Sequence, residues 1–170
     1  MICNAAHEVQ YLRHTLGETS APVFVVHNGI ELEPCEKTRA EWRAELGISE
    51  DVTVATMLAN FRPEKDHPTL LHAWRRLLGT IAHGQSRPRL LLAGAPQETY
   101  PAVRQLASCL GLLDTVSFPG QMRDVSGLLA ASDVGILSTE SEGLPNAVLE
   151  YMAGGLPVIA DGNFFRVIYT

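Results

Sequence analysis

Short apolar runs alternate with helical patterns along most of this chain, and no other feature constrains the fold as strongly. Between the runs, segments of about ten residues place apolar side chains at the spacing of a helix face. Strands and helices that alternate in this way form right-handed strand–helix–strand units around a mostly parallel sheet. The sequence therefore predicts an α/β protein, a three-layer sandwich with a mostly parallel sheet. The expected strands are residues 23–26, 52–58, 89–93, 116–118, 134–137 and 156–160.

The expected helices carry recognisable start and stop residues. Thr38 can cap the helix that follows it, and Gly47 and Gly111 can end the helices that precede them. A chain of 170 residues, with 46% hydrophobic and 19% charged residues, fits one domain that buries roughly 70% of its unfolded surface. The expected helices are residues 7–15, 39–46, 68–78, 101–110, 125–131 and 146–153.

The charge balance argues against nucleic acid as a partner. The sequence has 13 lysines and arginines against 19 aspartates and glutamates, a formal net charge of −6, and it has no basic cluster. An acidic domain that holds a phosphorylated ligand must place its few cations locally, which directs attention to individual Lys and Arg residues. Cys3, Cys35 and Cys109 lack metal-binding or redox spacing, and we expect no metal site.

The stretch Ser138–Ala160, STESEGLPNAVLEYMAGGLPVIA, is the most specific segment of the sequence. It predicts a polar loop, a helix with Pro145 at its first position, a Gly-Gly stop, and an apolar strand of the kind that is buried on both faces. Glu142 lies in the loop and Glu150 in the helix, where its apolar neighbours make an unpaired carboxylate costly. The loop also offers free backbone N–H groups and the positive end of the helix dipole, which suit a phosphate.

The segment EGLPNAVLEYMAGGLPVIA resembles the signature of retaining glycosyltransferases of family 4, which have the GT-B fold. That signature is a Glu, seven residues and a second Glu, flanked by Gly-Phe-or-Leu-Pro and by Ala-x-Gly-x-Pro-Val, and almost every element of it is present. The resemblance covers roughly residues 23–160. It implies a Rossmann-like domain, the truncated C-terminal half of a GT-B enzyme, which binds the nucleotide sugar.

The resemblance also divides the chain. We expect residues 1–20 to be a remnant of the preceding domain or a linker, residues 21–163 to be the nucleotide-sugar-binding domain, and residues 164–170 to be an unassigned tail. Neither end resembles a natural terminus, so we expect a fragment that lacks the N-terminal acceptor domain. No apolar run approaches 18 residues and no signal peptide is present, which predicts a cytoplasmic location. In the full-length protein the missing half would add peripheral contact with the inner membrane face.

Four loops that follow strands should meet at the carboxyl edge of the sheet, where open α/β sheets bind ligands. In the first loop, cations could stabilise the charge of a departing pyrophosphate without a metal ion. Lys65 matches the lysine of the family pattern. The position of the family arginine holds Asn60, and Arg62, two residues on, is the alternative. The four loops are residues 59–67, 94–97, 120–124 and 138–146.

The same resemblance assigns roles in the last of these loops and in its helix. Glu142 would lie near the transferred sugar and the reacting carbon, which with Lys65 and Arg62 makes it a catalytic candidate. Gly143, Leu144 and Asn146 would direct backbone N–H groups toward the sugar or the phosphate.

The nucleoside would lie deeper in the site. By the resemblance, Glu150 would accept hydrogen bonds from the ribose hydroxyls. The base would lie against the loop after the strand 116–118, where Met122 and Arg123 are candidates. The alternative for Met122 and Arg123 is that they are ordinary surface residues.

The leading hypothesis is a domain of a retaining hexosyltransferase that moves a sugar from a UDP- or GDP-sugar to a glycan or lipid-linked acceptor, as in polysaccharide biosynthesis. No cofactor and no metal are expected, and the isolated fragment is expected to be inactive. The alternative is a non-catalytic nucleotide-binding module that lacks the acceptor domain. A sugar-nucleotide epimerase has the same fold, whereas a dehydrogenase is disfavoured because no Gly-x-Gly-x-x-Gly follows a strand.

Overall fold

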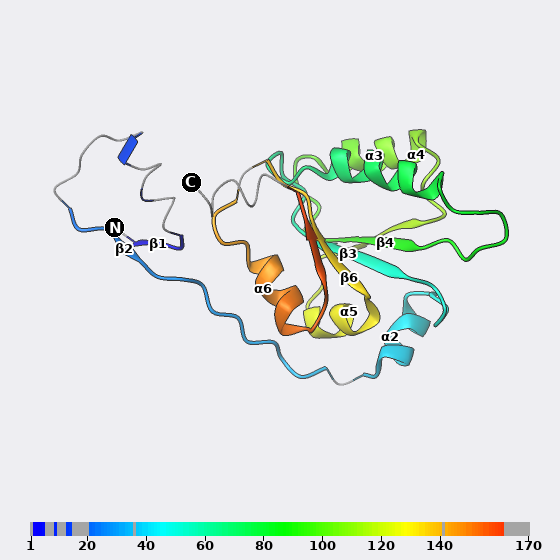
Figure 1. The fold of residues 1–170 in the computed structure, drawn as a ribbon, viewed down its shortest axis with the longest axis horizontal. Coiled ribbons are helices and arrows are strands. Elements are labelled where there is room, and N and C mark those ends of the chain that lie inside the picture. The colour runs from blue at the N-terminus through cyan, green and yellow to red at the C-terminus, as the bar shows by residue number, and fades with distance from the viewer. Residues whose placement is uncertain are drawn as a thin grey trace.

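A five-stranded sheet forms the centre of the computed structural model, which describes residues 2–5, 9, 13–14, 21–35, 37–140 and 142–161 (Figure 1). The strands are Val54–Leu58 (β3), Arg89–Ala93 (β4), Val116–Gly120 (β5), Val134–Leu137 (β6) and Val158–Ala160 (β7). Their order in the sheet is β5-β4-β3-β6-β7, and every neighbouring pair is parallel. The parallel sheet that the sequence predicts is confirmed.

Helices cover both faces of this sheet and complete three layers (Figure 1). The helices are Arg39–Glu45 (α2), His67–Leu78 (α3), Tyr100–Cys109 (α4), Val125–Ala131 (α5) and Asn146–Ala153 (α6). Helices α3 and α4 lie together on one face, whereas α2, α5 and α6 lie on the other. The predicted α/β sandwich is therefore confirmed.

Apolar side chains fill the space between the sheet and each helical layer. The larger core lies under α3 and α4 and includes Met57, Leu71 and Trp74. The smaller core lies under α5 and includes Leu91 and Leu128. Because successive side chains of a strand point to opposite faces, the inner strands contribute to both cores and read as continuous apolar runs.

Local signals set the ends of several helices. At α2, the Thr38 hydroxyl accepts a hydrogen bond from the Glu41 N–H, and the Glu41 carboxylate accepts one from the Thr38 N–H, which completes a capping box. Gly47 follows α2 and Gly111 follows α4, each with a φ of 66°. This left-handed conformation is one that glycine adopts without steric strain. The predicted roles of Thr38, Gly47 and Gly111 are confirmed.

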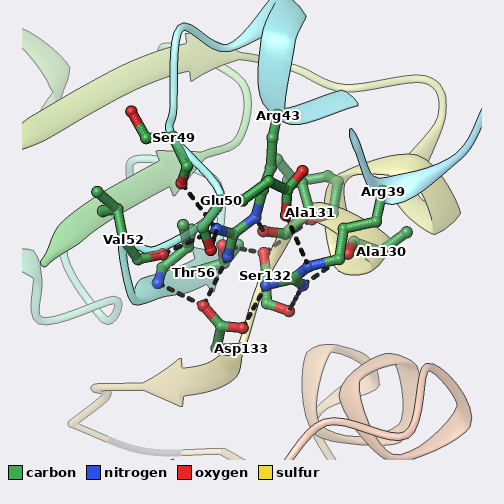
Figure 2. Close-up of polar contacts among 12 residues, drawn as sticks. Arg39, Arg43, Ser49, Glu50, Val52, Thr56, Ala130, Ala131, Ser132 and Asp133 are labelled. Atoms are coloured by element: carbon green, nitrogen blue, oxygen red, sulfur yellow. Dashed lines mark hydrogen bonds and ion pairs between the residues drawn. The ribbon is translucent and has the colours of Figure 1, made fainter. Parts of the chain in front are cut away.

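A buried arginine ties α2 to the amino ends of the central strands (Figure 2). The Arg43 side chain is 1% exposed, and its guanidinium donates to the Asp133 carboxylate at 2.8 Å. Asp133 also accepts from Arg39 at 2.5 Å and from the Val54 N–H at 2.7 Å. Burial acts to raise the pKa of Asp133, but these hydrogen bonds and the two guanidinium charges outweigh it and lower the pKa. Arg43 further donates to the carbonyl oxygens of Ser49, Glu50, Val52 and Ala131.

The last strand differs from its prediction. The apolar run 156–160 was expected to be buried on both faces of the sheet, and this expectation is wrong. Within the described residues β7 is an edge strand paired only with β6, and the Ile159 side chain is 59% exposed. An apolar run specifies a strand but not how many neighbours the strand has.

The N-terminal part forms a separate small sheet. The strand expected at 23–26 is Phe24–Val25 (β2), and it pairs in parallel with Ile2–Cys3 (β1) rather than with the five-stranded sheet. The helix expected at 7–15 lies largely outside the described residues, and the tail 164–170 lies wholly outside them. The proposed domain boundaries stay predictions.

Candidate functional site

The chain turns to opposite faces of the sheet after two neighbouring strands. Strand β3 is followed by α3 on one face, whereas β6 is followed by α6 on the other. Ligands of open α/β sheets bind at such a switch point, because the diverging loops leave a crevice. The β3–β6 ladder ends at the pair Thr56–Gly135. A cavity of about 460 Å³ opens at the carboxyl ends of these strands.

The cavity gathers residues from all four loops that the sequence placed at this edge. Lys65 comes from the loop after β3 and Gly94 from the loop after β4, while Met122 and Glu142 come from the loops after β5 and β6. Glu150, from α6, lines the same cavity. The predicted convergence of the loops is confirmed.

Lys65 and Glu142 form an ion pair between the loops after β3 and β6. Their side chains are 21% and 16% exposed, so the pair is largely shielded from solvent. Burial lowers the pKa of Lys65, and the nearby Arg62 charge acts in the same direction. The Glu64 carbonyl holds the two loops together, because it accepts from the Thr139 hydroxyl at 2.9 Å and from the Glu140 N–H at 3.0 Å.

Arg62 and Asn60 occupy the first loop in different ways. Arg62 is exposed, and its Nε donates to the Gln97 side chain at 2.7 Å. The Asn60 side-chain oxygen accepts from the Ala95 N–H at 2.9 Å, which links the loops after β3 and β4. Arg62 and Lys65 are the basic residues among the described residues that line the cavity.

Glu150 lines the cavity and is half-buried. It lines the same space as Lys65, and burial raises the pKa of its carboxyl. A desolvated carboxylate gains from hydrogen-bond donors that a ligand brings. The geometry thus suits an acceptor for polar ligand groups.

Helix α6 begins at Asn146, and Pro145 is its N-cap instead of the first helical residue that the sequence predicted. The first backbone bonds run from the Val148 and Leu149 N–H groups to the Pro145 carbonyl. The N–H groups of Asn146 and Ala147 precede these bonds and so have no helical acceptor. Both residues line the cavity, where the helix dipole adds partial positive charge. This end of α6 is suited to an anion such as a phosphate.

Sequence reasoning missed the contribution of the N-terminal part. The Asn28 side chain donates to the Asn146 side chain at 2.7 Å, across 118 positions of sequence. Asn4 and Asn28 both line the cavity, and the His27 ring hydrogen-bonds to the Asn4 carbonyl at 3.0 Å. The Asn-Gly pair at this point indicates only a turn, so no local signal announced the contact.

The remaining predicted residues divide into two groups. Met122 and Leu144 line the cavity, and Met122 also packs against the smaller core. Arg123 and Gly143 are not among the lining residues, and Arg123 is exposed. Gln121, which sequence reasoning did not single out, lines the cavity beside Met122. The functional roles of these residues stay predictions.

Gly94 permits close contact between the backbones that follow β3 and β4. A Cβ at this position would lie 2.0 Å from the Ala59 carbonyl oxygen. The Gly94 N–H donates to the Gly120 carbonyl at 2.9 Å, which ties in the end of β5 as well. The glycine is therefore needed for the packing of the cavity floor.

The part of the chain that the structure describes has neither a metal-binding cluster nor a membrane-spanning helix. No group of three or more His, Cys, Asp or Glu side chains there is arranged to hold a metal ion. Of the helices in that part, none has the length and apolar character to cross a bilayer. Cys3, Cys35 and Cys109 are free thiols.

Comparison with known proteins gives one family match and several partial relatives. The family model for glycosyl transferases group 1 matches residues 38–164. The D-inositol 3-phosphate glycosyltransferase of Geodermatophilus obscurus is 29% identical over 169 residues, which cover 94% of this chain and 37% of that protein. The N-acetyl-alpha-D-glucosaminyl L-malate synthase of Bacillus anthracis is 28% identical, with 94% of this chain and 40% of that protein covered. The chain thus spans well under half the length of these relatives.

A solved structure with the same fold is that of Anabaena Alr3699/HepE in complex with UDP and glucose. It matches with a TM-score of 0.78 at 22% sequence identity, over 94% of this chain and 43% of that chain. At this identity the likeness concerns the fold. The five-stranded parallel sheet with helices on both faces is the Rossmann-like arrangement of GT-B proteins.

Proposed function

The chain belongs to the glycosyl transferases group 1 family, and we propose that it is the donor-binding domain of a retaining glycosyltransferase of family 4. One observation carries the proposal: Lys65, Glu142, Glu150 and the start of α6 line a single cavity at the switch point of the sheet. Residues 21–163 would form this domain, and residues 1–20 would belong to the preceding domain or to a linker.

The diphosphate of the donor would lie where α6 begins. The N–H groups of Asn146 and Ala147 and the helix dipole favour an anion there, and the Lys65 ammonium faces the same space. If Arg62 gave up its hydrogen bond to Gln97, its guanidinium could donate two parallel hydrogen bonds to the diphosphate. Negative charge grows on the diphosphate as the bond to the sugar breaks, and these groups stabilise it. Because amides and side chains supply this stabilisation, we propose transfer without a metal ion or cofactor.

Glu150 would hold the ribose. Its desolvated carboxylate lies over one turn into α6, beyond the amides at the helix start. Two neighbouring hydroxyl groups are suitable donors to such a carboxylate. The base would then lie against Met122, where Gln121 offers a polar side chain.

Glu142 would act on the sugar side of the diphosphate. Its carboxylate forms an ion pair with Lys65. A bound diphosphate would compete for the Lys65 ammonium and leave the carboxylate free to contact the sugar. We propose that attack occurs on the face from which the diphosphate departs, so that the anomeric configuration is retained. Gly143 and Leu144 would contribute backbone N–H groups beside it.

The donor and the acceptor are identified only by class. The Anabaena structure contains UDP and glucose, and for this chain we propose a UDP- or GDP-hexose. A glycan or lipid-linked acceptor would bind a separate N-terminal domain, which would also make peripheral contact with the inner membrane face. The enzyme would act in the cytoplasm, in polysaccharide or glycolipid synthesis.

A second candidate function is nucleotide binding without transfer. The chain covers 37% of the Geodermatophilus protein and 40% of the Bacillus protein, and its cavity is lined by the residues to which we assign the donor. In isolation these residues would bind a nucleoside diphosphate and leave the sugar untransferred.

Calorimetric titration with UDP, GDP and ADP tests the proposal. We expect at least one of them to bind, and we expect Lys65→Ala and Glu150→Ala each to weaken binding by about tenfold or more, because charge-assisted hydrogen bonds are lost. Arg75→Ala and Glu98→Ala are matched controls, since both side chains are exposed and lie outside the cavity. The proposal is wrong if no nucleotide binds, or if the site variants bind like the controls.

A transfer assay separates the two candidate functions. A longer protein that joins this chain to an acceptor-binding domain should release the nucleoside diphosphate from its sugar donor when acceptor is present. Analysis of the product by NMR would then report the anomeric configuration, and inversion would contradict the retaining assignment.

A further inference from the structure

One fully buried side chain of α6 enters the crevice between β3 and β6. Tyr151 is 0% exposed, and its ring lies against Gly135 of β6. A Cβ at Gly135 would lie 2.3 Å from the ring, which no real contact allows. The tyrosine ring therefore occupies the space that a side chain at position 135 would fill.

The Tyr151 hydroxyl replaces a rung of the parallel ladder. Paired residues end at Thr56–Gly135, and one further rung in that register would join the Leu58 N–H to the Ile136 carbonyl. Instead, the Leu58 N–H donates to the Tyr151 hydroxyl at 2.6 Å, and the hydroxyl donates to the Ile136 carbonyl at 3.1 Å. The phenol thus separates the two strands at their carboxyl ends while satisfying both backbone groups.

This insertion lies directly beneath the cavity. Leu58, which donates to the hydroxyl, lines the cavity, and so does Glu150, the residue before Tyr151. Burial raises the pKa of Tyr151, so the hydroxyl stays protonated and can donate and accept at neutral pH. A single hydroxyl therefore sets how far apart the strands lie and where α6 sits against them.

We propose that Tyr151 is a positioning residue of the nucleotide site, which acts through Glu150 by fixing α6 to the separated ends of β3 and β6. The inference rests on the proposed function, since it concerns the placement of the ribose acceptor. Precise support of this kind matters because a binding group displaced by a fraction of an ångström loses much of its hydrogen bonding.

The test is calorimetric titration of the 170-residue chain with the nucleoside diphosphate that it binds best. Tyr151→Phe removes the hydroxyl and keeps the ring, and we expect about tenfold weaker binding. Tyr100→Phe is the matched control, because its ring packs against Phe61 outside the cavity, and we expect unchanged affinity. In a Glu150→Gln background, Tyr151→Phe should change affinity less than twofold, because the residue through which it acts is already altered.

The outcomes separate the two proposals. A parent chain that binds no nucleotide overturns the proposed function and this inference with it. A parent that binds, with Tyr151→Phe within twofold of it or with additive effects in the Glu150→Gln background, overturns this inference alone. Circular dichroism of each variant would verify that it is folded at the temperature of the titration.

Hydrogen exchange provides a measurement that does not depend on a variant folding. Nucleotide binding should slow exchange of the Leu58 amide more than that of amides in the interior of β4, because the ligand locks α6 and with it the hydroxyl that Leu58 contacts. Equal slowing at both places would also overturn the inference.

Discussion

Replacing the buried arginine Arg43 should remove a large share of the stability of this domain. Arg43 is 1% exposed and donates five hydrogen bonds, one to the Asp133 carboxylate and the others to backbone carbonyls (Figure 2). Arg43→Met keeps an apolar stem but removes the donor from four backbone carbonyls and one of the donors from Asp133, and at about 1 kcal/mol for each lost hydrogen bond the sum is about 3–5 kcal/mol. Whole domains are stable by only about 5–15 kcal/mol.

Arg39→Met is the matched control for this prediction. Arg39 donates to the same aspartate at 2.5 Å, but its side chain is 38% exposed, so water can replace much of what it provides. We expect it to cost about 1 kcal/mol.

Urea unfolding, followed by the fluorescence of the buried Trp42 and Trp74, measures both effects. With a slope of about 2 kcal/mol/M, Arg43→Met should lower the midpoint by roughly 2 M. Equal shifts for the two variants, or a shift below about 0.5 M for Arg43→Met, would refute the argument from burial.

Three further predictions concern the cavity. Burial raises the pKa of Glu150 above its ordinary 4.5, so the folded state disfavours the ionised acid. Glu150→Gln should therefore be more stable than the parent at pH 7. This difference in the free energy of unfolding should vanish as the pH falls below about 4.5, where the acid is protonated in both states. Urea titrations across this pH range check it, and a less stable variant at pH 7 contradicts it. Glu142→Gln removes the carboxylate that competes for Lys65, so calorimetry should show tighter binding of a nucleoside diphosphate and not weaker binding. Gly94→Ala should lower the free energy of unfolding by about 1–3 kcal/mol, because the new Cβ would meet the backbone. Gly29→Ala is the control, since no atom lies within 4 Å of its new Cβ, and it should change the free energy little. Thermal unfolding of both variants measures the difference, and equal losses would contradict the prediction.

The order of the elements could be predicted because each one is marked locally. Inner parallel strands read as apolar runs, and Thr38, Gly47 and Gly111 mark the ends of helices in ways that depend on neighbouring residues alone. The position of β7 could not be predicted, since the run that forms it is as apolar as that of an inner strand. Strand neighbours depend on long-range pairing, which the run does not encode.

The site could be predicted at the level of topology but not of contacts. Loops at the carboxyl ends of parallel strands meet in any such sheet, which is why Lys65 and Glu150 share a cavity as expected. The Lys65–Glu142 ion pair joins residues from distant loops, and nothing in either loop announces it. Tyr151 reads as an ordinary core residue, because its role depends on a glycine in another strand. Side-chain partners of this kind follow only from three-dimensional packing.

A crystal structure of the chain with its preferred nucleoside diphosphate would test the central claim most directly. The account predicts that the diphosphate lies against the Asn146 and Ala147 amides and Lys65, with the Glu150 carboxylate within about 2.5–3.2 Å of the ribose hydroxyls. A nucleotide bound away from the start of α6, or a Glu150 carboxylate that makes no contact with the ribose, would contradict it.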